Sequence, residues 1–146
     1  MPRPKVLLAL VFCTAVGCAL PATTFEAYRS KAVDAVEDVA SQARTAILTV
    51  ELALQDRLLA SAVTVQLEDA ETTAVGAVES FASAQPPDAR ADRLRARILP
   101  LLERAADAIT RMRFEAKRGH MAAALELRSS LLDPTAALER YAGSNA

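Results

Sequence analysis

Apolar residues recur along the first half of the chain with the spacing of a long helix. From residue 25 to residue 65 they follow an eleven-residue repeat at offsets 0, 3 and 7, which only Ser61 breaks. This repeat corresponds to about 3.67 residues per turn and fits a nearly straight α-helix. A second apolar stripe overlaps the first and continues to Phe81. Together with a capping box at Thr23-Thr24-Phe25-Glu26, the pattern predicts one helix from about residue 25 to residue 84.

Residues that stop a helix follow at Gln85-Pro86-Pro87-Asp88. Proline lacks the backbone donor and Asp88 is a favourable N-cap, so this segment predicts the tip of a hairpin. Apolar residues then recur on one face of a second helix, predicted over about residues 88 to 132. Pro100 is expected to kink it, and Gly119 to weaken or end it. Asp133-Pro134 predicts the start of a short C-terminal helix.

The predicted fold class is therefore all-α. The favoured arrangement is a long antiparallel hairpin, with helices over about 25–84 and 88–132 and a short C-terminal helix. The alternative is a compact four-helix bundle, in which the first helix bends between Glu68 and Gly76 because β-branched residues there lower helix propensity.

Charge is divided between the two predicted arms. Residues 24–84 carry ten acidic and four basic side chains, whereas residues 88–118 carry nine basic and five acidic ones. Five arginines recur every seven residues in the second arm: Arg90, Arg97, Arg104, Arg111 and Arg118. At the edge of an antiparallel helix pair such a row exchanges ion pairs with acidic residues of the other arm, here Glu79, Glu68, Asp69, Asp56 and Glu51. The row could instead bind the acidic face of a partner protein or anionic lipid headgroups.

The first eighteen residues have the order of a bacterial export signal. Arg3 and Lys5 are positively charged, an apolar run follows from Val6, and Ala15-Val16-Gly17-Cys18 closes it. This tetrapeptide resembles the lipobox of bacterial lipoproteins, with Ala15 where leucine is usual. The resemblance covers only this segment. It implies that Cys18 receives a diacylglyceryl group and becomes the first residue of a chain anchored on the extracytoplasmic face of the bacterial cell membrane.

This interpretation divides the chain into a signal peptide (1–17), a lipidated N-terminus with a short linker (18–23), a helical domain (24–142) and a frayed tail (143–146). Two alternatives remain open. A peptidase that cuts after small residues could use Gly17-Cys18-Ala19 and release a soluble protein. An uncleaved anchor is the other alternative, although the apolar run ends at Leu20 after fifteen residues and a membrane span needs about 20.

Residues that carry chemistry are scarce. Cys13 belongs to the predicted signal and Cys18 to the anchor, so no disulfide is expected, and His120 is the only histidine. The chain has no Gly-rich phosphate loop and no G-x-S-x-G or H-E-x-x-H motif. Its net charge of −1 becomes −3 without Arg3 and Lys5, which argues against nucleic acid as a partner. We expect a protein that is not an enzyme and holds no cofactor or metal.

The sequence therefore favours a non-enzymatic, lipid-anchored cell-envelope protein that acts as a helical protein-interaction or scaffold module. The expected partner is a second copy or another envelope protein, because the apolar stripes between Leu52 and Leu67 wrap more of the helix than one neighbour can cover. The expected contacts are the arginine row and Phe114. One alternative is a carrier of small apolar ligands or lipids, with a bundle cavity lined by aliphatics such as Ile47 and Val50. A hydrolase would require polar groups to converge near His120.

Overall fold

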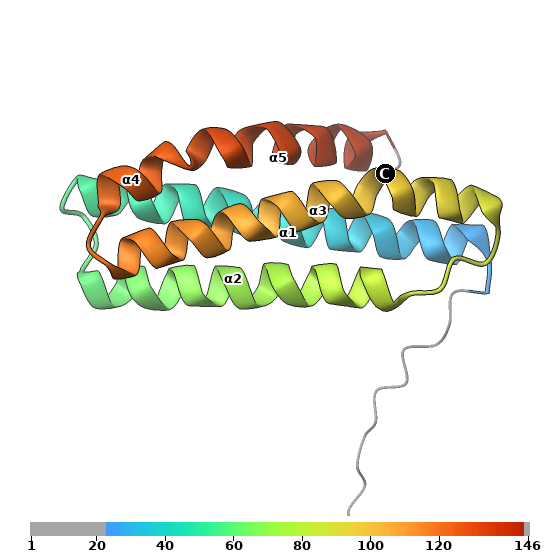
Figure 1. Cartoon of the computed structure of the whole chain (residues 1–146), viewed down its shortest axis with the longest axis horizontal. Coiled ribbons are helices and arrows are strands. Elements are labelled where there is room, and N and C mark those ends of the chain that lie inside the picture. Colours follow the sequence, from blue (N-terminus) through green and yellow to red (C-terminus); the bar gives the residue numbers. More distant parts are fainter. Residues whose placement is uncertain (1–22, 145–146) are drawn as a thin grey trace, which may run out of the picture.

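Five α-helices make up the protein in a computed structural model that describes residues 23–144 (Figure 1). They are α1 (Phe25–Leu54), α2 (Ala60–Ser83), α3 (Ala89–Lys117), α4 (Met121–Glu126) and α5 (Arg128–Gly143). α1, α2 and α3 run alternately in opposite directions, and α4 with α5 forms the fourth layer, packed on α1 and α3. The all-α class is confirmed, no strand occurs within residues 23–144, and the compact four-helix bundle is the arrangement adopted.

The predicted export signal and the predicted lipobox with Cys18 lie outside the described residues, as do Asn145 and Ala146. The described chain enters α1 through Thr24, whose hydroxyl accepts a hydrogen bond from the Ala27 backbone N–H at 3.2 Å. The predicted capping box is therefore shifted by one residue, because Thr24 rather than Thr23 is the N-cap. Glu26 instead forms an ion pair with Arg29 at 3.0 Å.

The single helix predicted from 25 to 84 is wrong, because the chain turns between Leu54 and Ala60. Asp56 adopts φ 54° there, the left-handed conformation that commonly ends a helix. The backbone N–H groups of Asp56 and Arg57 donate to the carbonyls of Ala53 and Leu52 at 3.1 and 2.9 Å, as in a Schellman motif. Glycine is the usual residue at this position, so a sequence with aspartate there gives no clear signal for a turn.

Folding back at this turn lets α2 bury apolar residues that an extended hairpin would leave in water. Val63, Leu67, Ala70 and Ala74 all pack into the core. The bend predicted between Glu68 and Gly76 is also wrong, because that segment is a continuous part of α2. Tertiary packing has overridden the weak local propensity of its β-branched residues.

The second arm ends earlier than predicted. α3 passes through Pro100 and stops at Lys117, and Gly119 at φ 81° closes it with a second Schellman motif. The N–H groups of Gly119 and His120 donate to the carbonyls of Ala116 and Glu115, both at 2.9 Å. The short helix predicted to start at Asp133-Pro134 is wrong, because α5 begins at Arg128 and passes through a buried Pro134. Pro134 has no backbone N–H to donate, and it lies buried beside Thr135, whose hydroxyl has no hydrogen-bond partner within residues 23–144.

The tip predicted at residues 85–88 is confirmed between α2 and α3. The Asp88 carboxylate accepts hydrogen bonds from the backbone N–H groups of Arg90 and Ala91, both at 2.8 Å, which fixes the first turn of α3. Close to this tip, Tyr28 of α1 and Phe81 of α2 are both buried with ring centroids 5.4 Å apart. This aromatic pair closes the core at the end of the bundle where α1 begins.

Candidate anion-binding cleft

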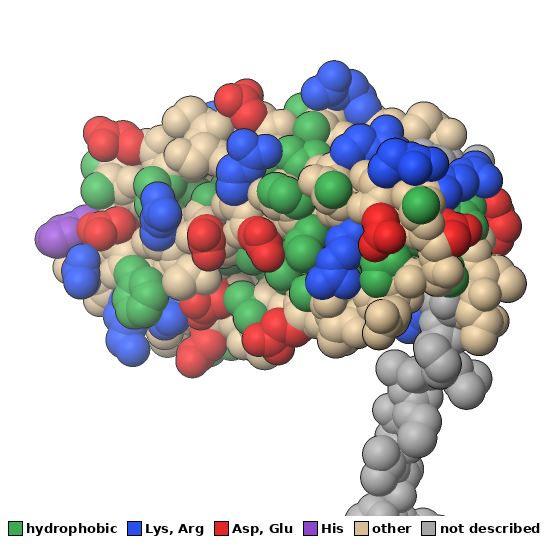
Figure 2. All heavy atoms as spheres, turned by 45° about the vertical axis from the view of Figure 1, so that its right-hand side comes forward, with side chains coloured by type: hydrophobic (Ala, Val, Ile, Leu, Met, Phe, Trp, Pro, Cys, Tyr) green, Lys and Arg blue, Asp and Glu red, His purple; other side chains and the backbone are tan. Residues whose placement is uncertain are grey.

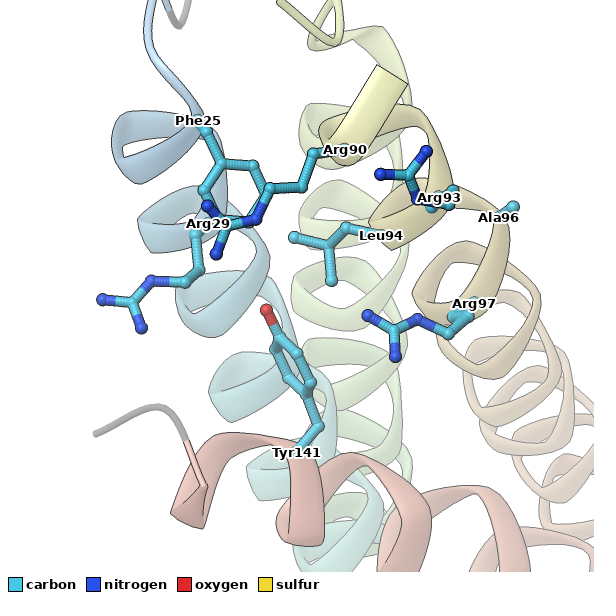
Figure 3. Close-up of a pocket in the computed structure, with 8 residues that line it drawn as sticks. All are labelled: Phe25, Arg29, Arg90, Arg93, Leu94, Ala96, Arg97 and Tyr141. Atoms are coloured by element: carbon cyan, nitrogen blue, oxygen red, sulfur yellow. The ribbon is translucent and has the colours of Figure 1, made fainter. Parts of the chain in front are cut away.

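A surface cleft of about 580 Å³ lies where the start of α1, the first half of α3 and the end of α5 meet (Figure 3). We call it the arginine cleft. It contains four arginines, two aromatic residues and two aliphatic ones, and no carboxylate. The lining residues are Phe25, Arg29, Arg90, Arg93, Leu94, Ala96, Arg97 and Tyr141.

Three of these arginines come from one face of α3. Arg90, Arg93 and Arg97 are spaced three and four residues apart, so helix geometry places them one above another. Leu94 is buried between them and forms part of the floor of the cleft. The N-cap Asp88, two residues before Arg90, fixes where α3 begins.

Two of the four arginines have partners inside the protein. The Arg90 guanidinium lies over the Phe25 ring at 3.8 Å from the centroid, a cation–π contact that holds this side chain at the start of α1. Arg29 lies on the opposite rim (Figure 3), and its guanidinium group is paired with Glu26 at 3.0 Å. No carboxylate among residues 23–144 pairs with Arg93 or Arg97. Positive charge at the cleft is therefore incompletely balanced.

The Tyr141 ring reaches into the same cleft from α5, with its hydroxyl pointing toward Leu94 (Figure 3). Burial raises the pKa of the Tyr141 phenol, because the phenolate is poorly solvated there, and the positive charges of Arg29 and Arg97 oppose this rise. Arg29 of α1 and Arg97 of α3 line the same cleft as this phenol, so residues of both helices border one small volume.

Positive side chains also gather on the surface around this end of the bundle. Figure 2 shows blue side chains concentrated near the end where α1 begins, whereas red and blue alternate along the rest of this face. The sequence places nine basic residues in 88–118, and the fold brings the first of them beside Arg29 of α1.

The predicted pairing of the arginine row with acidic residues of the first arm is wrong. None of the ion pairs within residues 23–144 joins the row to its predicted partners, and Glu51 instead pairs with Arg128 of α5 at 2.9 Å. The ion pair between α2 and α3 is made by Glu71 and Arg113, neither of which was expected. The turn at Asp56 is the physical reason, because it places the acidic residues of α2 at different depths from those of an unbroken arm.

The row itself is divided among several environments. Arg90 and Arg97 line the arginine cleft, whereas Arg104 donates to the carbonyl of Pro100 at 3.2 Å and lies with Arg111 in a smaller cleft beside α5. Arg118 pairs with Glu115 at 3.3 Å. The arginine row predicted from the sequence thus includes two of the four cleft arginines. Arg93 could have been found from its helix face, but Arg29 and Tyr141 reach the cleft only through tertiary structure.

The other candidate residues lie near the opposite end of the bundle. Phe114 is 46% exposed, and the Arg113 guanidinium lies 4.5 Å from its ring centroid. His120 Nδ1 lies 3.0 Å from a Glu115 carboxylate oxygen, in the turn that ends α3. Within residues 23–144 no group of three or more His, Cys, Asp or Glu side chains is arranged to hold a metal ion.

Apolar side chains are exposed around the α1–α2 turn, a region we call the leucine end. Leu59 is 77% exposed, Val65 56% and Leu48 55%, and Leu54 is exposed as well. Leu48, Leu52 and Leu58 also line a cleft of about 410 Å³ between α1 and α2. The bundle has therefore covered only part of the apolar stripe noted in the sequence, since Val63 and Leu67 are buried and their neighbours remain in water.

Comparison of the chain with models of protein families, with curated proteins and with solved structures gives no match. Across residues 23–144, none of the helices combines the length and the apolar character that crossing a membrane requires.

Proposed function

We propose that this protein is a non-enzymatic, lipid-anchored protein of the bacterial cell envelope, and that its helical bundle is a protein-interaction module. The observation that carries this proposal is the leucine end, where several large aliphatic side chains stay exposed although the core is otherwise well packed. Each aliphatic side chain left in water forgoes about 1.5 to 3 kcal/mol of burial. A surface of this kind favours coverage by another protein.

The proposed anchor orients the bundle. Cys18 precedes the first residue of α1 by seven positions, so even an extended linker reaches only roughly 25 Å. The end with the arginine cleft would then face the membrane. The 30 residues of α1 extend about 45 Å, which would place the leucine end far from the lipid surface.

The partner we propose for the leucine end is a second copy of this chain. Two molecules anchored in the same membrane leaflet carry their leucine ends at the same height, so the two patches meet side by side. An apolar patch matches its own copy without any need for complementary charge, as a twofold contact requires. Dimers of this kind would cover Leu48, Leu59 and Val65.

The carrier alternative gains no support from the packing. Ile47 and Val50, which would line a ligand cavity, instead belong to the core and are in contact with neighbouring apolar side chains. Alanine occupies many of the buried core positions, and small side chains at helix contacts favour a short distance between helix axes.

Self-association is tested with a chain that begins at residue 19, which keeps all five helices and lacks the proposed anchor. Sedimentation equilibrium at tens of micromolar should show a dimer, and the triple variant Leu48→Gln, Leu59→Gln, Val65→Thr should be monomeric. Leu132→Gln is the matched control, because Leu132 is an exposed leucine on α5, and this variant should remain dimeric. A monomeric unmodified chain would show that a second copy is not the partner.

The anchor is tested separately in the full chain. Mass spectrometry of the mature N-terminus should find a lipid on Cys18, and Cys18→Ala should move the protein out of the membrane fraction. An unmodified terminus at Leu20 would instead indicate soluble secretion, and would leave the result for the leucine end unaffected.

A further inference from the structure

We propose that the arginine cleft binds a phosphate group, that of an anionic phospholipid headgroup, through the guanidinium groups of Arg93 and Arg97. The choice of the phospholipid as the source of this phosphate rests on the proposed lipid anchor. The site itself rests on the cleft alone.

The arrangement of charges favours an external anion. Arg90 is held by the Phe25 ring and Arg29 by Glu26, whereas Arg93 and Arg97 have no carboxylate partner within residues 23–144. The cleft lining contributes no acidic side chain that could serve as an internal counterion. A bound anion would therefore neutralise charges that the fold has brought together.

The type of cation favours phosphate over a simple halide. Guanidinium is planar and offers paired N–H donors, which match two oxygens of a phosphate group in a bidentate contact. Arg93 and Arg97 are spaced i and i+4 on α3, so both forks can reach one anion from the same wall. In Figure 3 their guanidinium groups point to the same side of α3, toward α1 and Tyr141.

The size and position of the cleft favour a lipid headgroup as the source. A volume of about 580 Å³ exceeds that of a phosphate ion and leaves room for a glycerol moiety against Phe25, Leu94 and Ala96. The cleft also lies at the start of α1, the end that an anchor at Cys18 would hold next to the membrane. Arginines held next to a membrane are attracted to the anionic headgroups that its surface carries.

The experiment uses the chain that begins at residue 19, so that membrane binding cannot come from a lipid on Cys18. Flotation is compared between vesicles of phosphatidylcholine and vesicles of phosphatidylcholine and phosphatidylglycerol in equal parts. Binding of soluble phosphates is measured by calorimetric titration with glycerol 3-phosphate and with inorganic phosphate. We expect binding to the anionic vesicles and not to the neutral ones, and weaker binding of the soluble phosphates.

Matched variants separate a site from diffuse charge. Arg93→Gln with Arg97→Gln should weaken binding about tenfold or more, since each lost charge-assisted hydrogen bond removes a substantial part of the binding free energy. The control, Arg104→Gln with Arg111→Gln, removes the same charge from the same helix outside the cleft and should change affinity by less than about threefold. Arg93→Lys with Arg97→Lys keeps the charge and should still lose binding, because lysine cannot form the bidentate contact.

All three variants change exposed side chains, and circular dichroism should show an unchanged helical content. Equal losses in the cleft pair and the control pair would overturn the site, as would full retention by the lysine pair. Binding of soluble phosphates without binding of anionic vesicles would support the site and overturn the lipid as its source. Absence of binding both to anionic vesicles and to soluble phosphates would overturn the proposal, whatever the N-terminus of the mature protein proves to be.

Discussion

The helical core is closed in different ways at the two ends of the bundle. At the end where α1 begins, the buried aromatic pair Tyr28 and Phe81 fills the core, and the surface outside it is rich in arginine. At the leucine end, two Schellman turns reverse the chain, and aliphatic side chains such as Leu59 remain exposed. Large side chains thus complete the core at one end and are left over at the other. The difference indicates that the first end can interact through charge and the second through apolar contact.

Truncation of one apolar residue at each end should show the largest effect. Phe81→Ala removes a buried ring and should lower the free energy of unfolding by about 3–5 kcal/mol. Leu59→Ala should lower it by less than about 0.5 kcal/mol in the monomer, because the side chain is already in water. Urea unfolding followed by circular dichroism, at dilutions where association is absent, measures both. Similar costs for the two variants would mean that the leucine end is covered within the monomer.

The two turns of the leucine end differ in the residue at their left-handed position. Substitutions at these two residues should change the free energy of unfolding in opposite directions. Gly119→Ala should lower the free energy of unfolding by about 1–2 kcal/mol. The added methyl group has open space around it, so the cost comes from the left-handed backbone conformation, which is unfavourable for alanine. Asp56→Gly should stabilise by roughly 0.5 kcal/mol, because glycine tolerates φ 54°. Thermal and urea unfolding of the two single variants would measure both changes. A destabilising Asp56→Gly would show that the aspartate side chain contributes more than its strained backbone costs.

The smallest effect should appear only at high pH and should come from the arginine-rich end, which holds both tyrosines of the chain. Burial raises the pKa of Tyr28 above its ordinary value of 10.0, as it does for Tyr141. Above pH 10 the unfolded chain loses these protons first, so the free energy of unfolding should fall as the pH rises through the folded pKa. Below pH 10 these groups should leave it unchanged.

Tyr28→Phe combined with Tyr141→Phe should therefore flatten this decline, as measured by urea unfolding at a series of pH values between neutral and about pH 11. Tyr141→Phe alone is the intermediate case and should remove only part of the slope. An identical slope in the double variant and the unmodified chain would assign the decline to arginine and lysine instead.

Local patterns predicted the elements whose signals are carried by nearby residues. The tip at residues 85–88 follows from two prolines and an N-cap aspartate. Gly119 was recognised as a weak point, but the apolar pattern continues beyond it, so the predicted helix extended past the true end of α3 at Lys117. The turn at Asp56 was missed because its left-handed residue is not glycine. The start of α5 was missed because a proline is usually found in the first turn of a helix, whereas Pro134 lies buried inside α5.

For the candidate site, the sequence alone determined that α3 carries arginines on one face, because helix periodicity fixes which residues lie together along one element. It also determined the all-α class, since apolar residues recur with the period of a helix and the chain has only four glycines. Tertiary structure alone decided that Arg29 and Tyr141 join those arginines, and that the apolar stripe of the first half is buried in part and exposed in part. The physical reason is that both outcomes depend on where the chain reverses direction. The reversal at Asp56 is favoured by the total apolar area that the bundle buries, and no local sequence signal marks it.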